Sequence, residues 1–323
     1  MTDKLSGSKY NKLFGHFGAL ITVCAWGTSF ISTKVLMEDG GFSPIEVYVY
    51  RFTLAYILLL IFTYKKILAN SWHDEFQFFI CGICAGFLYF VTENYALKYT
   101  TTGNVSLLSS LSPIFTTVLM AVFFGSKIGA GTIIGSLTAL VGVGCIVFSH
   151  GEGFEINPLG DILALSSALC WAIYSIVVKK LIPNYTSLFI TRKIFIYGVL
   201  SSLILLLTTT PADGYHLQVL FDFAQPKYLM NFLFLAVMCS LAAFIIWNEA
   251  MKSLGPVTAN NYIYAQPIVT MIVAYFVLSE QIAILGYIGC ALIVGGLIIA
   301  DKLQFSGIRR LPKKAGASRY NNK

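Results

Sequence analysis

Ten side chains in this sequence carry groups that can bind a solute, and all of them fall inside long apolar runs. They are one arginine, one glutamate, two amides, two hydroxyls and four aromatic residues: Arg51, Glu93, Asn260, Gln266, Ser106, Ser110, Trp26, Trp171, Tyr174 and Tyr264. In apolar surroundings such groups need partners, because a buried polar group without one is costly. Their chemistry is hydrogen bonding, ring stacking and ion pairing, which suits reversible binding of a small polar molecule.

Two stretches place hydroxyl, amide and proline residues on one helical face. Both follow the i, i+4, i+7 spacing of a helix, in the sets Ser106, Ser110, Pro113 and Asn260, Tyr264, Pro267. Proline lacks an N–H and frees the carbonyl one turn earlier, so both prolines predict a kinked helix with an exposed acceptor.

Two interpretations of these faces stay open. Small hydroxyl residues such as Ser106 and Ser110 line a cavity or let neighbouring helices approach closely, and the sequence does not decide between the two. For Asn260, Tyr264 and Gln266 we favour a cavity, because larger hydrogen-bonding groups need partners that lipid does not offer.

Two tryptophans lie in the middle of apolar runs. Aromatic residues that anchor a protein at the membrane surface lie near the ends of spans, whereas Trp26 and Trp171 do not, and Tyr174 follows Trp171 by one helical turn. We expect these rings to wall a binding cavity, with plain helix packing as the alternative.

Few charges lie deep in the apolar runs. Arg51 either meets a carboxylate or extends outward to the headgroups, and Glu93 either binds a proton or an amine or reaches headgroup water. Arg192 and Lys193 are expected as interface anchors. Because a phosphorylated cargo would need several cations at its site, the scarcity of deep cations favours a zwitterionic or neutral cargo.

The composition excludes a water-soluble fold. Of 323 residues, 57% are hydrophobic and only 11% are charged, and the mean hydropathy is +0.75, whereas soluble domains carry roughly 25% charged residues. Disordered chains are rich in charge, so disorder is excluded as well. The net charge of +7 comes from short loops and the termini rather than from one exposed face, which argues against a nucleic-acid partner.

The apolar runs therefore predict an all-α integral membrane protein, since only helices and closed barrels satisfy their backbone groups in lipid. A span needs about 20 apolar residues. Parsing the sequence at Gly, Pro and charged loops gives ten transmembrane helices, at 14–37, 44–64, 77–97, 101–125, 129–148, 159–180, 186–208, 228–250, 256–278 and 281–301.

The distribution of Lys and Arg predicts the orientation of these spans. Most of the 22 basic residues fall on one side of the expected bilayer when both termini are cytoplasmic, as the positive-inside rule requires. The basic tail at 303–323 would then lie against anionic lipid of the inner leaflet. We expect a multi-pass protein of the plasma membrane, such as a bacterial inner membrane.

Cysteine and histidine show no pattern of cofactor chemistry. The seven cysteines lie in apolar runs, and the CxxC at Cys81 and Cys84 has no second pair nearby. The four histidines fall at span ends or in loops, without an HExxH, and no GxxxxGK[ST] loop is present. We therefore expect no cofactor, no metal and no enzyme, although an integral membrane enzyme stays an alternative.

The two halves of the sequence resemble each other. Shifts of 145 and 154 residues align a tryptophan pair, an asparagine pair, a proline pair and two glycine pairs: Trp26 with Trp171, Asn94 with Asn248, Pro113 with Pro267, Gly135 with Gly289 and Gly142 with Gly296. Each repeat holds five expected helices, and an odd number inverts the second repeat relative to the first. Inverted repeats are typical of secondary transporters that work by alternating access.

The matched segments also carry a family resemblance. The stretches AWGTSFISTKV, ALKYTTTGNVSLLSSLSPIFTTVLMAVFFGSKI and KSLGPVTANNYIYAQPIVTMIVAYFVLSEQI, with Arg51 in the second span, are similar to EamA-type permeases of the drug/metabolite transporter superfamily. The resemblance implies two EamA repeats, at 14–148 and 159–302. A cytoplasmic N-terminus at 1–13, an outer loop at 149–158 and the tail complete the chain.

We expect a transporter for a small zwitterionic or neutral metabolite, and the resemblance implies export of an amino acid or a related compound. One alternative is a channel, and another is a membrane scaffold that transports nothing. The expected partners are a small-molecule substrate and the lipid bilayer, and a monomer and a homodimer are both compatible with the sequence.

Overall fold

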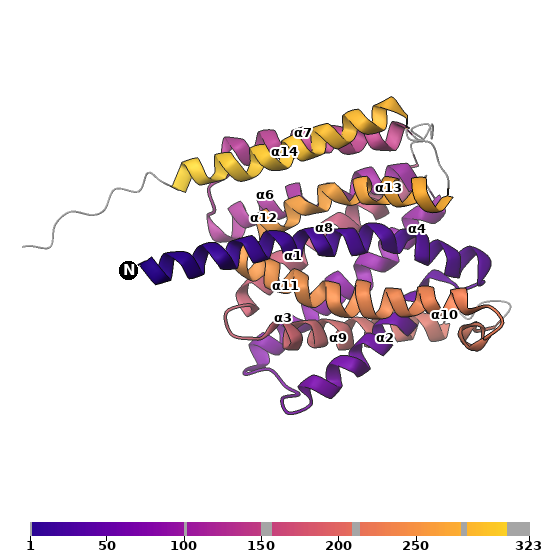
Figure 1. Ribbon diagram of the computed structural model, residues 1–323. Helices are drawn as coiled ribbons and strands as arrows, with labels where there is room; N and C mark the ends of the chain where they lie inside the picture. The colour runs from indigo at the N-terminus through magenta and orange to yellow at the C-terminus, as the bar shows by residue number, and fades with distance from the viewer. Residues whose placement is uncertain (1, 100–101, 150–156, 209–213, 279–282, 309–323) are drawn as a thin grey trace, which may run out of the picture.

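The computed structural model describes residues 2–99, 102–149, 157–208, 214–278 and 283–308, and it is a helical bundle with no strand among these residues (Figure 1). Eight helical segments are long and apolar enough to cross a membrane: Lys12–Asp39, Pro44–Thr63, Trp72–Ala96, Leu107–Phe124, Ala130–Phe148, Pro158–Leu181, Ser187–Thr208 and Pro226–Leu254. The expectation of an all-α, multi-pass membrane protein is confirmed.

Two of the ten expected spans are not among these eight. The stretch 256–278 is divided into three short helices. The apolar part of the last helix, Ile284–Ala300, is shorter than the 18 residues that the eight spans reach. The number of ten spans therefore stays a prediction. The expected outer loop at 149–158 and the basic tail at 303–323 fall largely outside the described residues.

The elements follow one another along the chain with short connections. Three stretches are π-helical (η1, η2 and η4) and two are 3-10 helices (η3 and η5), and the remaining helices are α-helices. Their bounds are α1 Thr2–Lys34, η1 Val35–Asp39, α2 Pro44–Thr63, α3 Trp72–Cys81, η2 Gly82–Leu88, α4 Tyr89–Tyr99, α5 Thr102–Ser109, α6 Ser112–Phe124, α7 Ala130–Ser149, α8 Pro158–Leu181, α9 Ser187–Thr208, η3 Leu217–Phe221, α10 Pro226–Leu233, η4 Phe234–Ala242, α11 Ala243–Leu254, α12 Pro256–Asn261, η5 Tyr262–Ala265, α13 Gln266–Leu278 and α14 Ile284–Ile308.

Local sequence signals place the helix starts. Ser43 caps α2 in a capping box with Glu46, and Pro44 occupies the first turn, where its missing N–H is harmless. Asn157 caps α8 by accepting a hydrogen bond from the Gly160 backbone at 3.1 Å. These caps pair backbone groups where the helices begin, so each long helix starts at a defined residue.

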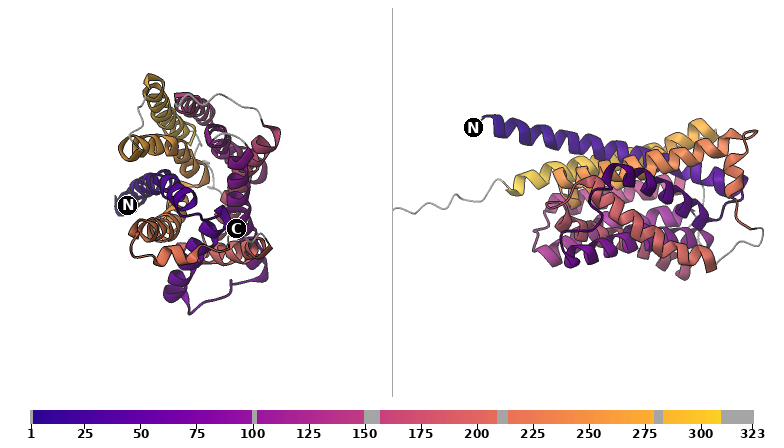
Figure 2. Two further views of the ribbon diagram at one scale, coloured as in Figure 1. Left: turned by 90° about the vertical axis from the view of Figure 1, so that its right-hand side faces the viewer. Right: turned by 90° about the horizontal axis from the view of Figure 1, so that it is seen from below.

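The helices pack against partners that are far away in the sequence. Helix α1 contacts α11 and α13, α8 contacts α4 and α6, α2 contacts α9, and α7 runs beside α14 along one edge of the bundle (Figures 1 and 2). The first residues of α1 and the last residues of α14 lie at the same end of the molecule (Figure 1). The apolar side chains on the outside, such as Phe62, Ile204 and Phe276, are exposed, as lipid-facing residues must be.

Candidate functional site

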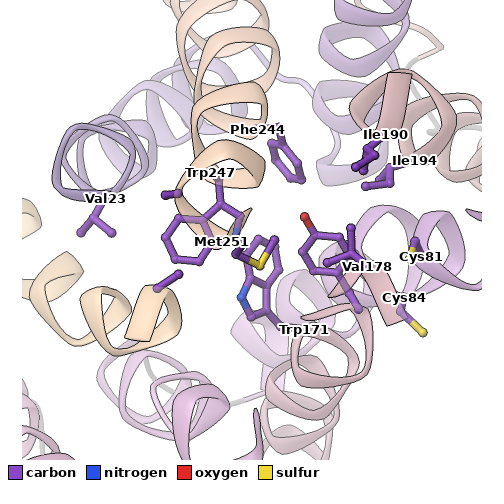
Figure 3. Close-up of a cluster of buried hydrophobic side chains, with 14 of the residues drawn as sticks. Val23, Cys81, Cys84, Trp171, Val178, Ile190, Ile194, Phe244, Trp247 and Met251 are labelled. Carbon is purple, nitrogen blue, oxygen red and sulfur yellow. The ribbon is translucent and has the colours of Figure 1, made fainter. Parts of the chain in front are cut away.

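An aromatic cluster occupies the region where α1, α8 and α11 meet. The ring centres of Trp26 and Trp171 are 5.3 Å apart in an edge-to-face arrangement, and Trp247 lies 5.1 Å from Trp26. Figure 3 shows Trp171, Trp247, Met251 and Phe244 within one cluster of buried, mostly hydrophobic side chains. Trp247 is fully buried, Trp171 is 5% exposed and Trp26 is half-buried. The two repeat-related tryptophans thus come into direct contact.

Asn260 holds the Trp171 ring in place. The indole Nε1 of Trp171 donates to Oδ1 of Asn260 at 2.8 Å, and the Asn260 amide donates to Oγ of Ser175 at 3.0 Å and to the Pro256 carbonyl at 2.8 Å. Asn260 is fully buried. Its amide therefore satisfies protein partners from α8 and α12.

A second polar chain links α8, α11 and α9. The Tyr174 hydroxyl donates to Oδ1 of Asn248 at 2.9 Å, and the Asn248 amide donates to Oγ1 of Thr191 at 3.1 Å. Tyr174, Asn248 and Thr191 are all fully buried. This chain fixes one side of the Trp171 ring, which lies 5.2 Å from the Tyr174 ring.

Both prolines coincide with breaks in helices. Helix α5 ends at Ser109 and α6 begins at Ser112, so Pro113 occupies the first turn of a new helix and Ser110 lies buried in the gap. Oγ1 of Thr117 donates to the Pro113 carbonyl at 2.9 Å. Pro267 follows the 3-10 turn η5 in the same way, as the second residue of α13. The backbone is therefore irregular at both positions.

Three more residues were predicted for the site, and the two whose side chains the structure describes differ in burial. Tyr264 is fully buried in η5, whereas Gln266 is half-buried at the start of α13. The side chain of Ser106 lies outside the part of the chain that the structure describes.

The two deep charges lie in the bundle and do not reach outward. Arg51 and Glu93 are each 8% exposed. The Arg51 guanidinium carbon lies 4.8 Å from the ring centres of both Phe52 and Phe90. Its Nε has no hydrogen-bond partner among the described residues. The Tyr89 hydroxyl donates to Oε1 of Glu93 at 2.8 Å.

These charges border the aromatic cluster. The Tyr89 ring lies 5.3 Å from the Trp171 ring, and Phe52 contacts Phe244 at 5.9 Å. Glu93 and Arg51 do not form an ion pair within 4.0 Å among the described residues. The centre of the molecule therefore holds one cation, one anion and several ring faces.

Sequence reasoning missed three parts of this centre. Trp247, Phe244 and Tyr89 were available to the argument that singled out Trp26, because each lies inside an apolar run. Arg192 and Lys193 were expected as interface anchors, and this was wrong. They are 2% and 4% exposed. Arg192 donates to the Ile67 carbonyl, in the connection after α2, at 3.0 Å, and Lys193 pairs with Glu75 of α3.

A multi-pass helical bundle with buried charges and hydrogen-bonding side chains at its centre is compatible with a small-molecule transporter. The family of EamA-like transporters matches residues 13–148 and 158–300. The chain belongs to this family, which confirms the resemblance found in the sequence.

Curated relatives from several organisms support the same class. An uncharacterized transporter from Clostridium kluyveri is 26% identical over 294 residues, covering 88% of this chain and 92% of the relative. The uncharacterized transporter YyaM of Bacillus subtilis is 26% identical over 299 residues, covering 88% of this chain and 89% of the relative. A probable terminal-alkyne amino-acid exporter from Streptantibioticus cattleyicolor is 24% identical over 284 residues, covering 88% and 92%. The family and these relatives are transporters and not enzymes.

A solved crystal structure shares the fold. It aligns with a TM-score of 0.73 at 19% sequence identity and covers 93% of this chain and 99% of the other. This likeness shows the arrangement of the helices and extends over nearly the whole molecule.

Proposed function

We propose that this protein carries a zwitterionic amino acid or a closely related metabolite across the plasma membrane, as an exporter that works by alternating access. The observation that supports the substrate class is the pair Arg51 and Glu93, buried at one aromatic centre without being paired to each other. A guanidinium binds a carboxylate and a carboxylate binds an ammonium group. Because the ring faces of Trp26 and Tyr89 add cation–π and apolar contacts, the centre is complementary to an amino acid.

In this proposal Asn260 and Tyr174 position the tryptophan ring, while Trp26, Trp171 and Gln266 border the substrate. Gln266 is half-buried at the first residue of α13, directly before Pro267. The breaks at Pro113 and Pro267 let helix segments on either side move separately. The exporter from Streptantibioticus cattleyicolor is named for an amino-acid cargo, which supports both the substrate class and the direction.

Reciprocal contacts support the inverted repeat. With a shift of 154, Gly135 corresponds to Gly289 and Gly142 to Gly296. A Cβ on Gly135 would lie 2.5 Å from the Gly296 carbonyl oxygen, and one on Gly142 would lie 2.7 Å from that of Gly289. Each glycine thus meets the repeat mate of the other, which is the pattern of a two-fold relation between α7 and α14.

The other helices repeat this pattern. Helix α1 packs against α11 and α13, and its expected repeat mate α8 packs against α4 and α6, which are the mates of those two. The family match also falls into two segments, 13–148 and 158–300. Two related halves that face each other supply two alternative packings, which alternating access requires.

The test is transport by purified protein in liposomes loaded with single amino acids. The variants Arg51→Gln and Glu93→Gln should each slow transport by about 10- to 100-fold, because a hydrogen bond to a charged group is worth about 1.5–3 kcal/mol. Lys34→Gln is the matched control, since Lys34 forms only an exposed pair with Glu38. Transport at the wild-type rate by both variants, with equal protein in the membrane, would contradict the proposed site.

The same assay distinguishes the alternative functions. A carrier saturates with substrate and exchanges labelled for unlabelled amino acid across the bilayer. A channel shows flux that rises in proportion to concentration, and a scaffold shows none.

A further inference from the structure

A pocket of about 390 Å³ lies between the end of α2 and the residues that lead from α8 into α9. Its volume falls in the range of roughly 300–1,000 Å³ that is typical of ligand pockets. Thr63, in its wall, lies 12 residues beyond Arg51 along α2, a distance of roughly 18 Å. The pocket is therefore separate from the proposed substrate site.

Two lysines give the pocket positive charge that no carboxylate of the described residues neutralises. None of the ion pairs among the described residues involves Lys65 or Lys66. The Lys66 ammonium lies 5.1 Å and 5.4 Å from the ring centres of Tyr185 and Phe189, which line the pocket. It also donates to the Asn70 side chain. An ammonium has three donors, so both lysines can still bind an anion.

The acidic groups near the pocket are already bound by protein. The Glu75 carboxylate pairs with Lys193, and the Tyr185 hydroxyl donates to Oδ2 of Asp74 at 2.7 Å. Burial and this hydrogen bond raise the pKa of Tyr185, so its phenol stays a donor at neutral pH. Arg192 adds a further positive charge behind the wall, where it binds backbone carbonyls. The cations in and behind the pocket wall are Lys65, Lys66, Arg192 and Lys193. These four cations exceed the two carboxylates, so the region carries a net positive charge.

An apolar track leads from the pocket along α2 toward the middle of the bilayer. Phe62 lines the pocket and is 73% exposed, and Ile61 and Ile57, one helical turn apart, are 61% and 50% exposed. Tyr64, also in the wall, is 61% exposed, at the level where aromatic residues meet lipid headgroups. A soluble anion would leave these apolar side chains uncovered, whereas the acyl chain of a lipid bound by its headgroup would cover them.

The geometry points to a binding site for an anionic phospholipid, with its phosphate between Lys65 and Lys66 and an acyl chain along Phe62, Ile61 and Ile57. Basic pockets at the ends of membrane helices are suited to such headgroups. The pocket takes Lys65 and Lys66 from the first half of the chain and Asn184 and Thr186 from the second half. A bound headgroup would therefore bridge the two halves.

The test titrates the full-length protein in detergent with phosphatidylglycerol and measures retained lipid by native mass spectrometry, with the melting temperature as a second readout. Phosphatidylglycerol should stay bound and raise the melting temperature, because a ligand that binds only the folded state stabilises it. Phosphatidylcholine and inorganic phosphate should do neither. The double variant Lys65→Gln, Lys66→Gln should weaken retention by about 10- to 30-fold, the loss expected for two lysines near an anionic surface.

Lys180→Gln is the matched control, because Lys180 is exposed at the end of α8 but does not line the pocket. It should retain lipid like the wild type. Both lysines of the double variant are exposed, so it should fold, and its melting temperature without lipid checks this. Equal retention by the folded double variant and the wild type would overturn the proposal. Inorganic phosphate that competes fully with the lipid would also overturn it, because the ligand would then be a soluble anion.

Discussion

Asn260 joins two helices through one amide, so we expect its removal to lower the stability of the folded protein. In Asn260→Ala the Trp171 indole N–H loses its acceptor, and the Pro256 carbonyl and the Ser175 hydroxyl lose a donor. A buried polar group without its partner costs about 1–3 kcal/mol. We expect a lower melting temperature in detergent and a shift in tryptophan emission as the ring loosens.

Thr138→Ala is the control for this variant. Thr138 is half-buried, and its Oγ1 donates to the Ile134 carbonyl of its own helix at 2.8 Å. A drop in melting temperature that is as large for Thr138→Ala as for Asn260→Ala would show that the interhelical bonds carry no special weight.

The sequence identifies which residues are unusual but not what they bind. Arg51, Asn260 and Trp171 stand out because lipid cannot satisfy their polar groups, and the structure does bury all three. The partners could not be predicted, since Asn260 meets Trp171 across 89 residues of chain. That pairing depends on how α8 and α12 pack, and a single apolar run carries no information about its neighbour.

At the scale of elements, the pair α7 and α14 depends on the absence of side chains. A Cβ at Gly142 would lie 2.7 Å from the Gly289 carbonyl oxygen and 2.8 Å from the backbone nitrogen of Ile293, so the helices would have to separate. Gly142→Ala should therefore lower stability by about 1–3 kcal/mol, the usual cost of overpacking. The measurement is the melting temperature in detergent.

Gly144→Ala on the same helix is the matched control. No atom lies within 4 Å of a Cβ built there, and alanine is the better helix former by about 0.5–1 kcal/mol. This variant should be as stable as the wild type or more stable. Equal destabilisation at positions 142 and 144 would contradict the close packing of α7 on α14.

Spans were predictable from hydropathy because lipid imposes one requirement on every helix, namely an apolar length. The stretch 256–278 departs from the simple expectation because its backbone is interrupted by the 3-10 turn η5 ahead of Pro267. The proline itself predicted irregularity there, but not that the stretch divides into three helices. The π-helical stretches η2 and η4 had no sequence signal of this kind.

At the scale of the whole molecule, alternating access predicts opposite changes at the two ends. Leu36 and Met251 are both buried, at 0% and 1% exposure. Met251 lies on α11, one turn before Leu254, and the Leu254 side chain comes within 3.0 Å of a Cβ built on Gly15 of α1. Leu36 lies 21 residues beyond Gly15, which is roughly 30 Å further along the same helical run. Single cysteines at these two positions therefore report on opposite ends of the bundle.

In a background without the seven native cysteines, chosen to retain transport, thiol labelling at positions 36 and 251 should change in opposite directions when the transported amino acid is added. A substrate shifts the equilibrium toward the state that binds it better, and in an alternating carrier the opening of one end closes the other. A cysteine at Leu137, which is 53% exposed on α7, should label at the same rate with and without substrate. Labelling that rises at both ends together would describe a continuous pore, and the two halves would then not be alternating.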